Sequence, residues 1–194
     1  MTTDALSEIA RGISQSASLI AMGLPLDVMA FGCTSASIVL GDASVEKLLT
    51  ASHPGIPATN PWAAAKAAFR RLAAEKVSIL SPYPTDINYP LYRQLVESGF
   101  DVPALGTFGI GNDTDITAVS HDSIVEGALQ VLERAQTDVL FVSCTNMRVL
   151  AHLQELERLL NVPVVCSSQA LFWHAMTLAG KTPECKGFGQ LLNH

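Results

Sequence analysis

Two cysteines occupy matching positions in this chain, and a thiol can act in catalysis as a nucleophile or as an acid and base. Cys33 lies in DVMAFGCTSAS, residues 27–37, and Cys144 lies in DVLFVSCTNMR, residues 138–148. Each copy reads Asp-Val, three apolar residues, one small residue and then Cys-Thr. The repeat indicates that each cysteine ends a buried strand, at the edge where parallel sheets bind their ligands.

The threonine after each cysteine predicts the start of a helix, because Thr34 and Thr145 are residues that favour the N-cap position. Such a helix would point the positive end of its dipole at the sulfur and lower the pKa of the thiol. The alternative is that both cysteines are small apolar core residues. Their equal contexts favour a reactive pair, whereas Cys166 and Cys185 are not duplicated and are predicted to be structural.

Apolar, β-branched runs alternate with helical patterns, which predicts an α/β fold with parallel strands. The expected strands are residues 26–31, 77–80, 139–142 and 162–165. The expected helices are residues 63–75, 89–98, 122–135, 150–160 and 168–179. The repeat predicts two similar units facing each other across a cleft, with crossings at GIPATNP, residues 55–61, and near Cys166. The first subdomain would contain residues 1–60 plus 166–194, and the second residues 61–165.

Composition excludes several classes of protein. A chain of 194 residues with 48% hydrophobic content can bury a sizeable core, and a net charge of -6 without a basic block argues against nucleic-acid binding. No apolar stretch is long enough to cross a bilayer, and the start MTTDALSEIARG does not fit a signal peptide, so a cytoplasmic protein is expected.

The cysteines show no CxxC pair or short Cys/His spacing, which argues against a structural zinc site. GIGND, residues 109–113, lacks the third glycine of a dinucleotide fingerprint.

Four segments resemble the aspartate/glutamate racemase superfamily and, within it, the maleate cis-trans isomerase group. They are CTSAS at 33–37, SPY at 81–83, SCTNMR at 143–148 and LERLLNVPVVCSSQALFWHAMTLAG at 156–180. The pairing of CTSAS with SCTNMR is similar to the maleate isomerase-like proteins linked to ectoine utilisation. The resemblance implies two pseudo-symmetric Rossmann-like subdomains with short parallel sheets and an active site between them. The first subdomain is expected to lack the usual N-terminal strand, and the sheet edge this exposes favours a homodimer.

The resemblance also implies a reaction, the cofactor-independent cis-trans isomerisation of a small unsaturated dicarboxylate of the maleate type. Cys33 would add to an alkene carbon to form a succinyl thioether, and Cys144 would handle the proton. The substrate carboxylates would be bound by the Tyr83 hydroxyl, the Asn112 side chain and the backbone amides of Thr34, Ser35, Thr145 and Asn146. No metal or organic cofactor is implied.

Other interpretations remain open. Tyr83 could pack against its flanking prolines, Arg148 could face the cleft or solvent, and Trp173 and His174 are expected to pack a helix. A racemase or epimerase of an amino acid or hydantoin is an alternative function, as is a truncated, non-catalytic dicarboxylate-binding or partner subunit. Two cysteines argue against the arylmalonate decarboxylase branch, which keeps only the second one.

Overall fold

The fold is built on a sheet of four parallel strands, seen in a computed structural model that describes residues 3–183 and 185–193. The strand order is β4-β3-β5-β6, with β3 at Val77–Ser81, β4 at Leu105–Thr107, β5 at Val139–Val142 and β6 at Val164–Cys166. Every residue of β3, β5 and β6 is buried. Their sequences are therefore continuous apolar runs rather than alternating ones.

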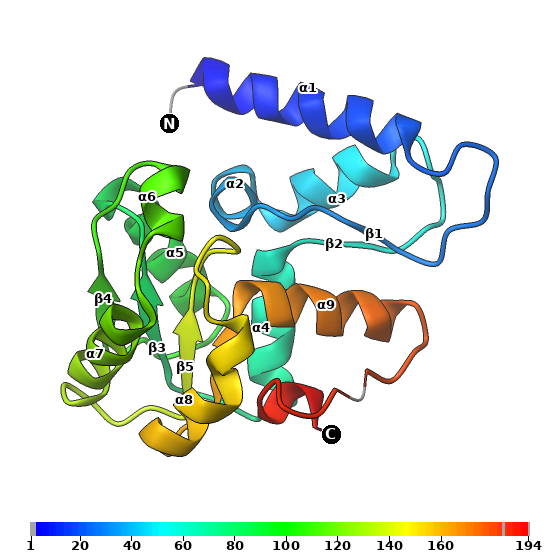
Figure 1. Ribbon diagram of the computed structural model, residues 1–194. Helices are drawn as coiled ribbons and strands as arrows, with labels where there is room; N and C mark the ends of the chain where they lie inside the picture. The colour runs from blue at the N-terminus through cyan, green and yellow to red at the C-terminus, as the bar shows by residue number, and fades with distance from the viewer. Residues whose placement is uncertain (1–2, 184, 194) are drawn as a thin grey trace.

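Helices cover both faces of this sheet (Figure 1). α7 (His121–Leu132) packs on β3 and β4, and α8 (Leu153–Leu160) packs on β6 and α7. On the other face α4 (Pro61–Arg71) and α9 (Ser167–Leu178) lie side by side, and α5 (Thr85–Glu97) connects β3 to β4. The aromatic rings of Trp62 and Phe69 on α4 pack against Phe141 of β5, so α4 is anchored at the centre of the core.

A smaller unit precedes this sheet in the chain and lies at the top of Figure 1. Its helices are α1 (Thr3–Leu19), α2 (Thr34–Leu40) and α3 (Asp42–Thr50), and they surround a two-stranded parallel sheet of β1 (Met29–Ala30) and β2 (Ala58–Thr59). This unit has its own apolar core, formed by Ile13, Ala17, Met29, Val45 and Leu49. The remaining elements are α6 (Asp113–Thr117), η1 (Leu150–His152) and η2 (Gln190–Leu192). Among the described helices, none has the length and apolar character needed to span a membrane.

The predicted α/β class and the parallel strands are confirmed. The strand expected at residues 26–31 is shorter than predicted, because only Met29 and Ala30 pair with β2. The pattern did not predict α3, α6, β2 or β4, which have few residues and weak periodicity, whereas α2 begins at Thr34 as the Cys-Thr pair predicts. The division at residues 60/61 and 165/166 stays a prediction, since α9 contacts both α4 and the β1-β2 sheet.

Candidate active site

Cys33 lies where β1 gives way to α2, at the N-cap of that helix. Its φ angle is -113°, and its carbonyl accepts hydrogen bonds from the amide (3.1 Å) and the hydroxyl (2.6 Å) of Ser37. The helix therefore begins directly after the cysteine, as the sequence predicts. The sulfur is half-buried and lies 3.5 Å from the hydroxyl of Ser35.

Cys144 follows β5, and the prediction of a helix directly after it is wrong. A turn occupies residues 145–149, and the first helical residue is Leu150 of η1. Unlike Cys33, Cys144 has a φ angle of +90°, in the left-handed region. Its amide donates to the Ser167 hydroxyl at 3.0 Å, and its sulfur accepts from the Asn146 amide at 3.4 Å.

A hydrogen bond joins the two cysteine segments. The hydroxyl of Thr145 donates to the carbonyl of Gly32 at 3.0 Å, so the residue after Cys144 is bonded to the residue before Cys33. On the other side, the Ser168 hydroxyl donates to the Thr145 carbonyl at 3.4 Å. Tertiary structure thus brings the two copies of the repeat into contact, which their separation in the chain could not show.

Three buried hydroxyl groups gather beside these segments. They belong to Thr34, Tyr83 and Ser143, are at most 4% exposed, and have no hydrogen-bond partner among the described residues. The pKa of Tyr83 responds to Cys144, Ser143 and Thr34, which shows that all three surround its hydroxyl. Buried hydroxyls without partners are costly, so a cluster of them indicates a place where a polar ligand binds.

Tyr83 is held in this position by a network in the loop after β3. Its amide donates to the Ser81 hydroxyl at 3.0 Å, and that hydroxyl donates to the Asn88 side chain at 2.7 Å. The Asn88 amide group returns a bond of 2.5 Å to the Tyr83 carbonyl, and the Thr107 hydroxyl donates to the same carbonyl at 2.5 Å. This network fixes the backbone of Tyr83, and the role of its side chain stays a prediction.

Burial changes the acidity of the groups at this site. It raises the pKa of Tyr83 well above its ordinary value, and the Cys144 sulfur raises it further. It also raises the pKa of Cys144. The nearby Tyr83 hydroxyl and the amides of Asn146 and Met147 lower this pKa, whereas the Asp113 carboxylate raises it. The lowered pKa expected for Cys144 is therefore wrong, because the helix start that would lower it is absent. Cys144 is a thiol at neutral pH, suited to donating a proton.

A cavity of about 270 Å³ opens beside Tyr83 and the start of α2. Its walls are polar and apolar in about equal parts, and the described residues that line it include no lysine or arginine. They are Ser35, Tyr83, Pro84, Asp86, Ile87, Ile110, Gly111, Asp113 and Ile116. A ligand in this cavity would meet two hydroxyl groups, two carboxylates and three isoleucine side chains.

The other predicted residues have different positions. Asn112 is exposed and caps α6, since its side-chain oxygen accepts from the Asp115 amide at 2.9 Å. Arg148 is exposed. His174 bonds to the Thr59 hydroxyl at 2.7 Å, and Trp173 is a core residue. Burial raises the pKa of Cys166, at the end of β6, to about 11.

Sequence reasoning missed three residues that build this site: Ser143, Ser167 and Asn88. Ser143 is the small residue before Cys144 in the repeat, and that position was considered only for its size. Ser167 and Asn88 contact the site through bonds that close only in the tertiary structure. In the sequence their only signal is a polar residue close to a predicted strand end.

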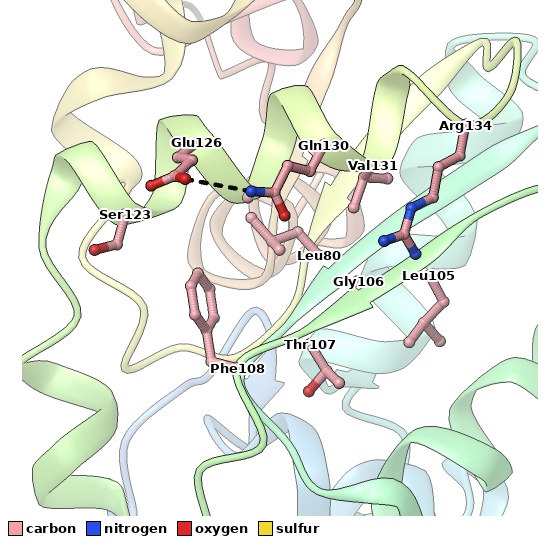
Figure 2. A pocket seen from close by; sticks show the side chains of 11 residues that line it. Leu80, Leu105, Gly106, Thr107, Phe108, Ser123, Glu126, Gln130, Val131 and Arg134 are labelled. Atoms are coloured by element: carbon pink, nitrogen blue, oxygen red, sulfur yellow. Dashed lines mark hydrogen bonds between the residues drawn. The ribbon is translucent and has the colours of Figure 1, made fainter.

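A larger cavity, of about 490 Å³, lies between β4 and α7 away from both cysteines. Figure 2 shows Glu126 and Gln130 of α7 and Arg134 of the turn after it along one side, and Gln130 donates a hydrogen bond of 3.3 Å to Glu126. β4 passes close beneath α7 at Gly106, where a Cβ would lie 2.5 Å from a methyl group of Val131. The described residues that line this cavity include no cysteine and none of the three unpartnered hydroxyls beside the cysteine segments.

Known proteins share this fold. One is a double mutant of arylmalonate decarboxylase, with a glycine changed to cysteine and a cysteine to serine, solved in liganded form. It aligns with a TM-score of 0.89 and 26% identity, and the alignment covers 99% of this chain and 83% of that chain. A cysteine-to-serine mutant of the Nocardia farcinica maleate cis-trans isomerase, with a covalently bound succinylcysteine intermediate, aligns with a TM-score of 0.87 over 98% of this chain and 80% of that one. Its identity of 18% shows the fold alone. The fold implied by the resemblance is confirmed.

Sequence comparison is more specific. The arylmalonate decarboxylase of Bordetella bronchiseptica is 30% identical over 164 residues, which cover 82% of this chain and 68% of that protein. The sequence profile of the arylmalonate decarboxylase family matches residues 1–192. The presence of a second cysteine was expected to separate the chain from this branch, and that expectation is wrong. A fold shared with arylmalonate decarboxylases and maleate isomerases, together with a profile match along almost the whole chain, makes this chain a member of the arylmalonate decarboxylase family.

Proposed function

We propose that this chain is a cofactor-independent isomerase of a small unsaturated dicarboxylate, with Cys33 as nucleophile and Cys144 as acid and base. The observation that carries this proposal is the contact between two cysteine segments whose thiols have different environments. Cys33 is half-buried at a helix start, whereas Cys144 is buried and has a raised pKa. A nucleophile paired with a proton donor is what addition to a carbon–carbon double bond requires.

The reaction would proceed by addition, rotation and elimination. The Cys33 thiolate forms a bond to one alkene carbon, and the neighbouring carbon takes the proton of the Cys144 thiol. The double bond is then a single bond, so the two carboxylate-bearing carbons can rotate. The Cys144 thiolate next removes the proton, the bond to Cys33 breaks, and the trans alkene leaves both thiols in their starting states.

Neutral donors would bind the substrate carboxylates. The hydroxyls of Thr34, Tyr83 and Ser143 are buried and unpartnered, and a carboxylate oxygen accepts hydrogen bonds from such groups in place of water. The carboxylates of Asp86 and Asp113 in the cavity wall oppose a second negative charge. Binding of a dianion is therefore expected to be weak, and binding of a monoanion stronger, because like charges repel in a desolvated site.

A second candidate function is decarboxylation of a malonate that carries an apolar substituent. Three isoleucines of the cavity wall, Ile87, Ile110 and Ile116, favour it because they offer a surface for such a group. The arylmalonate decarboxylase relative supports it too. This reaction would need only Cys144, which would give its proton to the carbanion left after CO₂ departs.

The two reactions separate in one set of measurements. Maleate in deuterated water is followed by NMR, with fumarate as the product of isomerisation, and phenylmalonate is assayed for release of CO₂. Exchange of deuterium into the α-carbon of an amino acid or hydantoin would identify a racemase. Cys33→Ser and Cys144→Ser are compared with Cys185→Ser, which changes a thiol outside the site.

We expect fumarate from the wild-type chain and from Cys185→Ser, and a loss of at least about 100-fold in either site variant. Intact mass should show a succinyl adduct on Cys33 in the Cys144→Ser variant and none in Cys33→Ser. Release of CO₂ that survives Cys33→Ser but not Cys144→Ser would establish the decarboxylase instead. No turnover of any substrate would contradict both candidates, and thermal stabilisation by maleate without product would favour a binding subunit.

A further inference from the structure

Three side chains converge outside the active-site cavity, at the point where α7 and α8 begin. His121 is the first residue of α7, His152 is the last residue of η1, and Glu155 lies in the first turn of α8. One possible ligand atom from each lies within 4.8 Å of the other two. The cluster contains no cysteine, so the search for short Cys/His spacings could not find it.

The distances within this cluster fit a metal ion after small adjustments. The imidazole rings of His121 and His152 lie 4.1 Å apart between centroids, at an interplanar angle of 31°. Nδ1 of His152 lies 3.9 Å from a carboxylate oxygen of Glu155. Ligand atoms of a tetrahedral zinc site are separated by roughly 3.3 Å. Rotation of partly exposed side chains can close the difference, because His152 and Glu155 are 43% and 59% exposed.

One ring nitrogen of the cluster is buried without a partner. Nδ1 of His121 is buried and has no hydrogen-bond partner. This orphaned atom indicates that the surroundings of the His121 ring are incomplete without a ligand.

Carboxylates near the cluster offset the repulsion that the positive dipole ends of α7 and α8 exert on a cation. A groove of about 400 Å³ runs from the cluster along α7 and α8, and its lining includes Asp122, Glu126 and Glu155. The described residues of that lining include no lysine or arginine. Three carboxylates against two partial dipole charges leave the groove negative, which favours a divalent cation.

We propose that His121, His152 and Glu155 bind a divalent transition-metal ion of the zinc type. Each histidine would supply one ring nitrogen and Glu155 one carboxylate oxygen, leaving a fourth position for water. Two imidazoles with one carboxylate suit Zn²⁺, whereas Mg²⁺ and Ca²⁺ prefer oxygen ligands. The ion would tie the start of α7 to the start of α8. A short segment joins α7 to α6, which lines the cavity through Asp113 and Ile116.

Co²⁺ added to the full chain after removal of metals by a chelator tests this proposal directly. We expect one equivalent to bind and to give visible bands without the near-ultraviolet charge-transfer band that marks thiolate ligands. This distinction matters because Cys33 and Cys144 are free thiols that could bind the same ion. A thiolate band at one equivalent, or no binding, would overturn the proposal without the use of any variant.

Variants then identify the ligands through the Zn²⁺ dissociation constant, measured by competition with a chromophoric chelator. His121→Asn and His152→Asn should each raise it at least about tenfold, and Glu155→Gln should raise it as well. Glu126→Gln is the matched control, since it removes the same charge from the same groove, and it should change the constant less than about twofold in 0.15 M salt. Wild-type affinity in both histidine variants would refute the site, with circular dichroism used to confirm that each variant is folded.

Discussion

The positive φ angle of Cys144 predicts that glycine at this position makes the protein more stable than alanine does, which is the opposite of the usual effect of glycine. Its φ angle of +90° is one that residues with a Cβ rarely adopt, whereas Cys33 has an ordinary φ angle of -113°. Two pairs of variants isolate this difference, Cys144→Gly with Cys144→Ala and Cys33→Gly with Cys33→Ala. Within each pair the sulfur and its contacts are lost equally, so only the Cβ differs.

The expected magnitudes follow from two opposing effects. Glycine in place of alanine normally lowers the free energy of unfolding by about 0.4–1 kcal/mol, because the unfolded chain becomes more flexible. At a left-handed position glycine also removes a strain of roughly 1–2 kcal/mol. Cys33→Gly should therefore be less stable than Cys33→Ala, whereas Cys144→Gly should be more stable than Cys144→Ala by about 1 kcal/mol. The difference between the two pairs equals the strain alone, roughly 1–2 kcal/mol.

Urea unfolding of the four variants measures these free energies, and thermal melts provide a check, since 1 kcal/mol shifts the Tm of a chain of this size by about 2–4 °C. The slope of free energy against urea must stay the same within each pair for the comparison to hold. If glycine is less stable than alanine by the same amount at both cysteines, Cys144 has no strained backbone.

Three further predictions concern other features of the fold. Iodoacetamide labelling as a function of pH should modify Cys166 least of the four cysteines, because burial raises its pKa to about 11. Labelling of Cys166 at neutral pH would contradict its burial. Asn60→Ala should lower the free energy of unfolding by about 1 kcal/mol in urea titrations, since the Asn60 side chain caps α4 from a buried position. Asn112→Ala removes an exposed cap and should lower the free energy of unfolding by less. Burial raises the pKa of Glu157 above its ordinary 4.5, so its contribution to stability is fully present below that pH and declines as the pH rises through the folded-state pKa. Glu157→Gln should therefore gain in stability relative to wild type between pH 4 and pH 7, and a constant difference would refute the raised pKa.

The buried strands could be predicted from sequence with good accuracy. Residues 77–80 and 139–142 are uninterrupted apolar runs because both faces of the sheet are covered by helices, and β3 and β5 match them closely. The edge strand β4 could not be predicted, since Leu105–Thr107 is half-exposed and only three residues long. The two-residue strands of the small sheet are shorter than any pattern that periodicity can detect.

The site was predicted less evenly. Thr34, Tyr83 and Cys144 lie together, and Cys33 directly precedes Thr34. The motifs include all four residues, and their roles in binding or catalysis stay predictions. Asn112 is a helix cap, although its sequence context resembles that of a ligand. The repeat led to a wrong prediction for its second copy, because identical Cys-Thr pairs predicted a helix start after both Cys33 and Cys144. The chain after Cys144 turns instead, since the Cys144 amide bonds to Ser167, which lies on a different element.

By itself the sequence determined the α/β class, the central strands and the two cysteines, because these depend on local composition and on patterns within single elements. Tertiary structure alone decided the acidity of Cys144, the cluster of unpartnered hydroxyls and the convergence of His121, His152 and Glu155. The physical reason is that burial, strain and the meeting of ligand atoms depend on which elements pack together. Residues 121 and 152 belong to separate helical segments, so only packing of α7 beside α8 could bring their rings into contact.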